Sequence, residues 1–529
     1  MVSDSTGTQM KTVAVLGAAY GGNRAAQILA AGLPEGWRIV LVDRNTHFNH
    51  VYVMPRLAVL PGHENKAFVP YTRVFWKNNA IRESPHVLLH ASVVSVHPNH
   101  AILSKAFPEH GLPTTRLDFD YCVYALGSQL PDPLNLWGPL PSLGVMKISN
   151  PSYNGTKKDS VAWLKHNQKV VEEAPSVLVV GGGALGIQFA TDIADLYPTK
   201  SVTLLHSRHR LMPAYDEELH LEVLKGLESL NVNVILGERL DLSSANDANA
   251  KLNDRGQRVV RTVKGREIAA DLVMLCTGQN PNTSFLKEMD PNTINPANNL
   301  AHVLRTMQLG VLTPSKIVSP HVATPAEPEL PAETEKAAVE SLDNPEAEAT
   351  APVQSPEEQL KAALEKISLA EEEALEREKR GERSPSLSSA SSESDEEEVD
   401  QQQQQEEEPT TREWTPYPHM FCVGDSADAF GAIKAGHTAY WQGEVAGRNI
   451  VRLINNAALE EEGKEGAWEE LEDYHSGPPA IKVTLGLRKA AFQVRGVVGA
   501  KDDGVDDVQA PIIWTSWGYE INSDEDFAA

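Results

Sequence analysis

The 529-residue sequence predicts an α/β fold with two Rossmann-like dinucleotide-binding domains, a small β-rich C-terminal module and a disordered acidic insertion. Three observations predict this class. A pattern of strand, glycine-rich turn, helix and strand occurs twice, in residues 11–45 and 176–208. Residues 313–412 are too rich in charged and small polar residues to bury a core. Alternating apolar residues, which indicate strands, return in residues 478–520.

Both copies of the repeated pattern read as a strand–helix–strand unit. Each begins with a buried apolar strand, turns on glycines, continues as a helix and returns as a second strand. The predicted elements are strand 12–17, helix 18–33 and strand 37–44 in the first copy, and strand 176–183, helix 184–197 and strand 201–208 in the second. Such units build a parallel sheet and place the turn where a dinucleotide pyrophosphate binds.

The turn of the first copy reads Gly17-x-Ala19-x-x-Gly22, with Ala19 in place of the middle glycine. Gly21 adds slack just before the third position. Alanine is tolerated in the middle when the phosphates lie slightly farther from the backbone. Asp43 ends the next strand, where a carboxylate binds the ribose 2′-hydroxyl of an adenosine. A turn-capping role for Asp43 is the alternative.

The turn of the second copy has the full spacing, Gly181-x-Gly183-x-x-Gly186. The three glycines permit the tight turn, the approach of backbone N–H groups to the pyrophosphate and the packing of helix on strand. No acid ends the second strand, where His206 and Arg208 stand instead. A guanidinium without a carboxylate favours a 2′-phosphate. We therefore expect NADPH to bind, alongside NADH, unless Arg208 points to solvent.

Each unit ends alike, with a buried strand and a small-residue turn in 117–129 and in 270–282. After the insertion, residues 414–454 predict a strand, a glycine–aspartate turn and a long helix. Asp425 lies in that turn, before the helix N-terminus, where its carboxylate can accept hydrogen bonds from sugar-alcohol hydroxyls.

Composition excludes several classes of function. The net charge is −26, but residues 325–412 hold 26 Asp and Glu against 8 Lys and Arg, which leaves about −8 for the rest of the chain. Without a basic stripe, nucleic acid is not expected as a partner. The three cysteines are too far apart for a metal site, and a chain without a disulfide framework fits a reducing compartment. No apolar run is long enough to cross a membrane, and no secretory signal begins the chain, so we expect a cytoplasmic protein.

Several motifs in the same order resemble the two-dinucleotide-binding-domain flavoproteins, within the pyridine nucleotide-disulphide oxidoreductase superfamily. The sequence is most similar to the apoptosis-inducing factor 2 and ferroptosis-suppressor branch and its fungal relatives. The motifs that carry the resemblance are GAAYGG, VDRNTHFNHVYVMPRLAV, YALGS, GGGALG, TLLHS, CTGQNPN and VGDSADA with AGHTAYWQGEVAGRNI after it. They cover the chain apart from the insertion.

The resemblance implies FAD on the first unit and NAD(P)H on the second. The residues it places at FAD are Gly17, Ala19, Gly22, Asp43, Arg56, Ala125, Gly127 and Asp425. The residues it places at NAD(P)H are Gly181, Gly183, Gly186, His206, Arg208, Thr277 and Gly278. It implies this domain order: 11–150 first part of the FAD-binding domain, 151–285 NAD(P)-binding domain, 286–312 return to the FAD domain, 313–412 disordered insertion, 413–456 second part of the FAD domain and 470–529 C-terminal module.

Three residues are candidates for the chemistry itself. Lys434 and His437 lie in a segment that resembles the flavin-facing helix of family quinone reductases, where either could stabilise reduced flavin or donate a proton. A surface or capping role is the alternative for both. Gln188 stands where family members commonly carry Glu, so it cannot hold a negative charge near the nicotinamide. Trp441, in the same segment as Lys434 and His437, is expected to pack in the core rather than against a quinone.

A second departure from the family limits the acceptor. The disulfide-reductase members carry a C-x4-C pair, and this chain has none, so it cannot reduce a disulfide through an internal dithiol. The expected function is an FAD-dependent NAD(P)H oxidoreductase that passes electrons to a quinone or another small acceptor. The alternatives are a reductase of a protein electron carrier and a cell-death-factor-like signalling flavoprotein with slow redox turnover. Peripheral contact with a membrane or lipid droplet and a homodimer are left open.

Overall fold

The protein is described from a computed structural model of the whole chain. The described residues are 10–75, 84–143, 148–150, 153–245, 251–311, 415–464, 467–502 and 504–528. They belong to one compact unit, Met1–Val318 with Arg412–Ala529. The predicted disordered insertion, 313–412, lies outside the described residues.

The first unit is built on a six-stranded sheet in the order β20-β21-β9-β1-β2-β5, parallel except between β20 and β21. Because both faces of a parallel sheet are covered, its strands read as continuous apolar runs, and Val13–Leu16 are fully buried. The strands are β1 (Lys11–Leu16), β2 (Trp37–Asp43), β5 (Val87–His90), β9 (Tyr121–Tyr124), β20 (Gln308–Leu309) and β21 (Tyr417–Cys422).

The second unit repeats this plan with a four-stranded parallel sheet in the order β13-β12-β11-β17. Its strands are β11 (Ser176–Val180), β12 (Ser201–Leu205), β13 (Asn233–Ile235) and β17 (Leu272–Leu275). The helices of this unit are α3 (Lys157–Glu173), α4 (Ala184–Leu196) and α5 (Glu217–Ser229). The predicted fold class of two Rossmann-like units is confirmed.

Smaller elements complete the two units. They are β3 (His47–Asn49), α2 (Met54–Leu57), β4 (Phe68–Pro70), β6 (Val93–His97), β7 (His100–Leu103), β8 (Arg116–Asp118), β14 (Lys251–Leu252), β15 (Arg258–Arg261), β16 (Glu267–Ala270), α6 (Ser284–Met289), β19 (Ala301–His302) and β22 (Ala427–Asp428). A short antiparallel pair, β10 (Ser128–Gln129) with β18 (Asn280–Pro281), joins the ends of the two units. The small-residue turns that end the two units, in 117–129 and 270–282, therefore meet in space.

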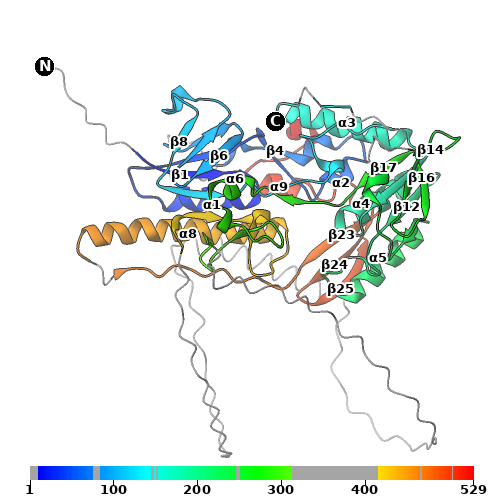
Figure 1. The fold of residues 1–529 in the computed structure, drawn as a ribbon. Helices are drawn as coiled ribbons and strands as arrows, with labels where there is room; N and C mark the ends of the chain where they lie inside the picture. The colour runs from blue at the N-terminus through cyan, green and yellow to red at the C-terminus, as the bar shows by residue number, and fades with distance from the viewer. Residues whose placement is uncertain are drawn as a thin grey trace, which may run out of the picture. The chain divides into compact units, whose positions relative to one another are not determined.

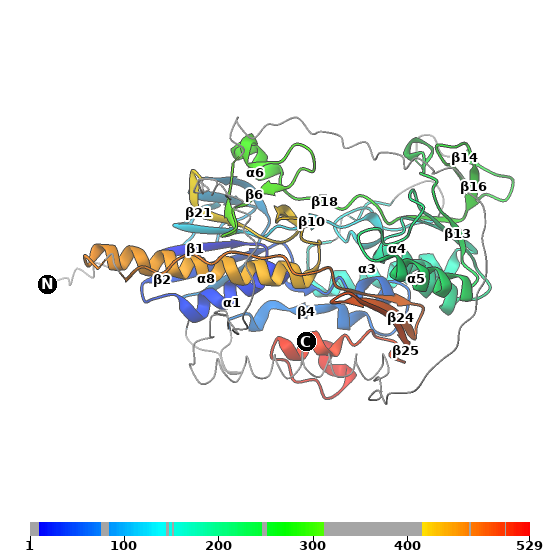
Figure 2. The same ribbon diagram turned by 90° about the horizontal axis from the view of Figure 1, so that it is seen from below.

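The helix after the first turn, α1 (Tyr20–Gly32), packs along α8 (Gly436–Glu461), and the two run side by side in Figures 1 and 2. A Cβ on Gly443 would lie 2.1 Å from the carbonyl oxygen of Gly21, so only glycine fits at this crossing. A Cβ on Gly21 would in turn lie 2.9 Å from the carbonyl oxygen of Ala439. The interpretation of Gly21 as slack in the turn is wrong: it is a helix residue that lets α8 approach.

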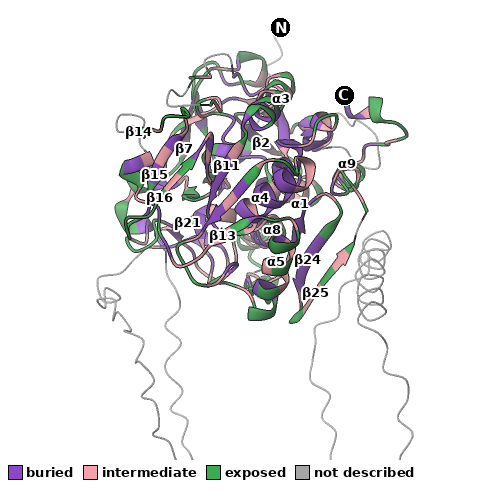
Figure 3. Ribbon diagram, turned by 90° about the vertical axis from the view of Figure 1, so that its right-hand side faces the viewer, coloured by how far each residue is buried: buried purple, intermediate pink, exposed green. Residues whose placement is uncertain are grey.

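The C-terminal module is a three-stranded antiparallel sheet followed by a short helix. Its elements are β23 (Ile481–Leu485), β24 (Lys489–Val494), β25 (Val497–Asp502) and α9 (Pro511–Ser516). The sheet contacts α4 and α5 of the second unit. Trp514 of α9 is fully buried and donates its indole N–H to the carbonyl oxygen of Lys66 in the first unit, at 3.0 Å. The module therefore binds both units, and the buried residues in Figure 3 lie largely on the sheets and on the helix faces turned to them.

Candidate active site

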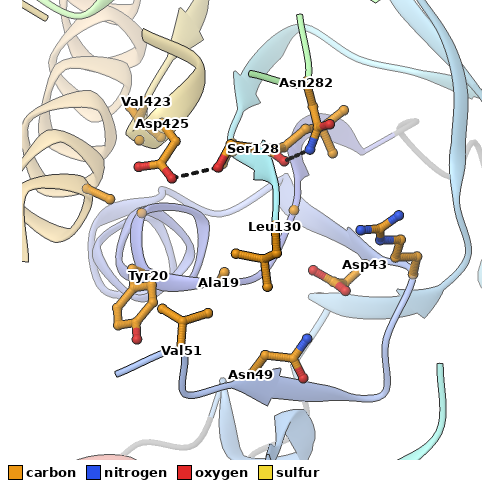
Figure 4. Close-up of a pocket in the computed structure, with 18 of the residues that line it drawn as sticks. Ala19, Tyr20, Asp43, Asn49, Val51, Ser128, Leu130, Asn282, Val423 and Asp425 are labelled. Atoms are coloured by element: carbon orange, nitrogen blue, oxygen red, sulfur yellow. Dashed lines mark hydrogen bonds between the residues drawn. The ribbon is translucent and has the colours of Figure 1, made fainter. Parts of the chain in front are cut away.

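A cavity of about 450 Å³ lies where the first turn, the carboxyl ends of β2 and β9 and the start of α8 come together (Figure 4). Asp43 and Asp425 stand on different sides of it, and Tyr20 and Val51 lie beside each other at its wall. Ligands of parallel α/β sheets bind at this edge, beyond the carboxyl ends of the strands. The cavity is large enough for a sizeable part of a nucleotide cofactor.

The geometry of the first turn explains its glycines. Gly17 has φ +98°, and a Cβ there would lie 2.3 Å from the carbonyl oxygen of Ala125. A Cβ on Gly22 would lie 1.8 Å from the carbonyl oxygen of Gly17. Ala19 is the N-cap of α1 and lines the cavity, so the open N–H groups of the helix face the space where an anion would lie. The residues present therefore fit a dinucleotide pyrophosphate.

Asp43 closes the cavity on the side of β2. Its Oδ2 accepts the backbone N–H of Ala18 at 2.8 Å, and its Oδ1 accepts that of Asn45 at 2.7 Å. Burial raises the pKa of Asp43, and the two backbone donors oppose that rise. The carboxylate is therefore held in place at the edge of the cavity, where it can accept ribose hydroxyls. Asp43 both caps the turn through these backbone contacts and lines the cavity, so its capping role does not exclude a role in binding the cofactor.

Asp425 forms a polar cluster with residues of both units. Its Oδ2 accepts the Ser128 hydroxyl at 2.8 Å and the Gln279 amide at 2.6 Å. Burial raises the pKa of Asp425, while the Ser128 hydroxyl and the charge of Lys434 oppose that rise. Lys434 is exposed and also lines the cavity. The structure thus brings together Asp425 and Lys434, which the sequence predicted separately as a cofactor ligand and a catalytic residue.

The second turn repeats the first almost atom for atom. Gly181 has φ +127°, and a Cβ added there would lie 2.7 Å from the carbonyl oxygen of Cys276. A Cβ added at Gly186 would lie 1.9 Å from the carbonyl oxygen of Gly181. Gly183 is the N-cap of α4, is exposed, and a Cβ there would meet nothing within 4 Å. The turn therefore leaves open space over the helix N-terminus, as a second dinucleotide requires.

The other residues predicted at NAD(P)H lie around this turn. The Nδ1 of His206 accepts the backbone N–H of Gly182 at 3.0 Å, and burial lowers the pKa of His206, so the imidazole supports the turn as a neutral group. Arg208 is exposed after β12, and Thr277 and Gly278 are exposed after β17. Each is accessible to a bound nucleotide, and their contacts with it stay predictions.

Of the residues predicted at FAD or for the chemistry, four do not line the cavity: Gly22, Arg56, Gln188 and His437. Gly22 lies beneath the turn, and His437 is an exposed residue of α8 between Gly436 and Ala439, which do line the cavity. Arg56 is fully buried and donates to backbone carbonyls of the C-terminal module, including Gly486 at 2.5 Å. The expectation that Arg56 binds FAD is therefore corrected, because its guanidinium is already committed to protein partners.

The burial of two further side chains bears on their predicted roles. Gln188 is a residue of α4 and only 6% exposed. Its contact with a nicotinamide stays a prediction. Trp441 was expected in the core, but its side chain is 56% exposed, in edge contact with Tyr440. That expectation is wrong, because the position falls on the outer face of α8.

Sequence reasoning missed part of the cavity wall. The missed lining residues include Tyr20, Asn49, Val51, Ser92, Ser128, Gln279 and Asn282. Ser128 and Gln279 had a signal, since they occupy equivalent turns at the ends of the two units. Of the others, Tyr20 begins α1 and Asn49 ends β3, and the fold brings these separate segments together around the cavity.

Dithiol and metal chemistry find little support among the described residues. All three cysteines are free, and burial raises the pKa of each thiol. Within the described ranges, no group of three or more His, Cys, Asp or Glu side chains is arranged to hold a metal ion. None of the helices in those ranges is long and apolar enough to span a bilayer.

Comparison with known proteins places these features in context. Residues 11–302 match the family model described as pyridine nucleotide-disulphide oxidoreductase. Fe-regulated protein 8 of Mycosarcoma maydis is 34% identical over 517 residues, which cover 97% of this chain and 96% of that protein. Ferroptosis suppressor protein 1 of Taeniopygia guttata is 30% identical over 279 residues, 51% of this chain and 64% of that protein.

A solved structure shares the fold. The sulfide:quinone oxidoreductase of the hyperthermophilic bacterium Aquifex aeolicus matches with a TM-score of 0.52 and 14% identity. The match covers 96% of this chain and 89% of that one. At this level of identity the likeness concerns the fold alone.

Proposed function

This chain belongs to the pyridine nucleotide-disulphide oxidoreductase family, and on that premise we propose that it passes a hydride from NAD(P)H to FAD and the electrons on to a quinone-type acceptor. It is an oxidoreductase whose cofactors are FAD and NAD(P)H. The resemblance to the ferroptosis-suppressor and apoptosis-inducing-factor branch is confirmed. When bound, FAD accepts the hydride and releases electrons singly or in pairs.

The observation that carries the proposal is the contact between the two units at the cavity. Gln279 follows the last strand of the second unit, yet its amide donates to Asp425 and to Ser128 in the wall of the first cavity. A hydride moves only between groups in contact. The turn that ends the NAD(P)H unit reaches the FAD cavity, which is the arrangement that such a transfer needs.

The chain's own residues bind and orient the cofactors. We assign Gly17, Ala19, Asp43, Ala125, Gly127 and Asp425 to FAD, and Gly181, Gly183, Gly186, His206, Arg208, Thr277 and Gly278 to NAD(P)H. Gly22 serves FAD by closing the turn. Lys434 lines the cavity with a free approach to solvent, so its ammonium can offset negative charge that develops on reduction. His437 stays a candidate proton donor, and Gln188 stays a candidate contact of the nicotinamide.

A small acceptor fits the site better than a dithiol. Disulfide reduction, which the family name describes, needs a pair of reactive cysteines. Burial raises the pKa of the Cys122 and Cys422 thiols, which makes them less reactive. The cavity wall combines apolar side chains such as Val51, Leu130 and Phe285 with polar side chains that can orient a small organic ligand, among them Ser128, Asn282 and Lys434.

The test is a spectrum of the purified protein under anaerobic conditions. The oxidised flavin band should be present, should bleach with NADPH and NADH, and should return when a soluble quinone is added over many turnovers. If the flavin band returns only when a protein electron carrier is added, the acceptor is a protein of that class and not a quinone. A single slow bleaching that no acceptor reverses would favour the signalling alternative. Vesicle flotation and sizing of the same sample test the membrane contact and the homodimer that the sequence leaves open.

A further inference from the structure

A tyrosine and a histidine form a pair in the cavity wall that the proposed function does not yet use. Tyr20 is the first residue of α1 and lines the cavity. His50 follows β3, and its Nδ1 lies 3.2 Å from the Tyr20 hydroxyl oxygen. Among the described residues, this contact with Tyr20 is the hydrogen bond that the structure shows for the His50 ring.

The ring of Tyr20 is fixed on both sides. Phe48 meets it edge to face, with ring centroids 4.7 Å apart. On the side of α8, a Cβ on Gly436 would lie 2.6 Å from the ring, so the helix backbone is in close contact with it. Figure 4 shows the hydroxyl end of Tyr20 beside Val51. The hydroxyl is therefore held against His50 without rotamer freedom to lose, which is the preorganisation that proton transfer requires.

The proposed reaction needs one proton from outside. The balance is NAD(P)H plus quinone plus one proton giving NAD(P)⁺ plus quinol. The hydride supplies two electrons and one proton, so one of the two O–H bonds of the quinol is made with a proton from solvent. A cavity that shields the acceptor from water must therefore contain a route for that proton.

We propose that Tyr20 is a catalytic acid that donates this proton to the reduced acceptor, and that His50 is the positioning residue that restores it. In this step the Tyr20 O–H bond breaks and an O–H bond forms on the acceptor oxygen. The Nδ1–H of His50 then passes to the Tyr20 oxygen, and Nε2 of the same ring takes a proton from water. Each group returns to its starting charge, and His50 changes only its tautomer.

The protonation states of the pair agree with this order. Burial raises the pKa of Tyr20 well above its ordinary value, so the hydroxyl keeps its proton until the strongly basic reduced acceptor takes it. Burial lowers the pKa of His50 to about 4, so the ring is neutral at neutral pH and can relay by tautomer exchange. Lys434 and Asp425 line the same cavity, and the negative charge of Asp425 adds to the rise in the pKa of Tyr20.

The inference rests on the proposed function, and rapid mixing of the FAD-loaded protein separates the two. The variants are Tyr20→Phe, which removes only the hydroxyl, and His50→Gln. Matched controls are Tyr519→Phe, whose hydroxyl bonds Pro70, and His97→Gln on β6, since neither residue lines the cavity. Flavin content and the flavin spectrum establish that each variant is loaded.

We expect flavin reduction by NADPH to be unchanged in all variants. Reoxidation by a soluble quinone should slow on the order of 10²-fold in Tyr20→Phe, the scale of general acid catalysis, with a smaller loss in His50→Gln. Reoxidation by ferricyanide, which takes electrons without protons, should keep its wild-type rate. Nitrogen NMR of selectively labelled histidine gives a readout apart from activity: the Nδ1 signal of His50 should shift in Tyr20→Phe.

Other results overturn the inference. Unchanged quinone reoxidation in Tyr20→Phe, or an equal loss with quinone and with ferricyanide, would remove Tyr20 as a proton donor while leaving the proposed function intact. Wild-type protein that is reduced by NADPH and reoxidised by ferricyanide but never by a quinone would instead refute the acceptor class, and the proton route with it.

Discussion

Arg56 in α2 and Asp192 in α4 form an ion pair in which Nη2 lies 2.9 Å from Oδ1, and both side chains are buried. The same guanidinium donates to the carbonyl oxygens of Gly486, Leu487 and Asp506. Helix α2 belongs to the first unit, α4 to the second and the carbonyls to the C-terminal module. One side chain therefore joins all three parts of the fold, and the charge of Arg56 opposes the rise that burial causes in the pKa of Asp192.

Breaking this pair should destabilise the protein strongly. Arg56→Met leaves the Asp192 carboxylate buried without a counter-charge, which typically costs about 3–5 kcal/mol of unfolding free energy. The double variant Arg56→Met with Asp192→Leu should recover a large part of that loss, because no charge stays buried. Urea unfolding of the three proteins measures this. A single variant that loses less than about 1 kcal/mol, the scale of an exposed pair, would contradict the assignment.

The crossing of α1 and α8 should not tolerate a methyl group. Gly443→Ala gains helix propensity of about 1 kcal/mol, but its Cβ would lie 2.1 Å from the carbonyl oxygen of Gly21, and backbone cannot move aside cheaply. We expect a net loss of about 1–3 kcal/mol, measured by thermal or urea unfolding. Gly477→Ala, where a Cβ meets nothing within 4 Å, is the control and should be near neutral. Equal stabilities for the two variants would show that the helices separate without cost.

The second turn separates folding from nucleotide binding. Gly183→Val should leave stability nearly unchanged, since a Cβ at Gly183 meets no protein atom within 4 Å, but should abolish NAD(P)H binding by filling the pyrophosphate space. Gly186→Ala should destabilise the fold, because its Cβ would lie 1.9 Å from the carbonyl oxygen of Gly181. Calorimetric titration with NADPH and urea unfolding test the pair. Normal NADPH affinity in Gly183→Val would place the nucleotide elsewhere.

Asp43 should control FAD affinity, and Asp43→Asn should also lower stability somewhat, because the amide NH2 would face one of the two backbone N–H groups that the carboxylate accepts. Asp43→Asn keeps the shape but loses the charge that strengthens hydrogen bonds to ribose, which is worth about 1.5–3 kcal/mol, or roughly ten- to a hundredfold in Kd. Flavin fluorescence on titration of apoprotein gives the Kd. Asp120→Asn is the control, because Asp120 also accepts a backbone N–H, that of Thr12, but does not line the cavity. Similar FAD affinities for both variants would leave Asp43 with the capping role alone.

His47 should make the fold sensitive to acid. Its Nε2 lies 2.9 Å from the Ser160 hydroxyl, the ring is fully buried, and burial, followed by the charge of Lys157, lowers its pKa from 6.5 to about 3. The unfolded chain therefore binds more protons than the folded one between those values, so this residue's contribution to stability is lost as pH falls from about 6.5 toward 3. His47→Gln should flatten the dependence in that window. The difference between the two unfolding curves isolates His47 from other titrating groups, and parallel curves would contradict the prediction.

Much of the site followed from sequence because its parts are local. Gly17, Gly22, Gly181 and Gly186 are required by contacts within a single turn and the strand beside it, so spacing alone predicts them. Asp43 was predicted in the same way, as the last residue of the strand that follows the turn. The duplication of the pattern also predicted two strand–helix–strand units, and each of them lies in a parallel sheet of the structure.

The tertiary structure decided what depends on distant partners. Arg56 binds carbonyls 430 or more residues along the chain, Gly21 is required by α8, and Tyr20 meets His50 through a loop. No periodicity marks these residues, because their environment is created only when the units and the C-terminal module pack. The sequence by itself determined where two dinucleotide turns form, since steric limits on a turn act over a few residues. Packing determined which side chains surround the cavity, since that depends on the whole fold at once.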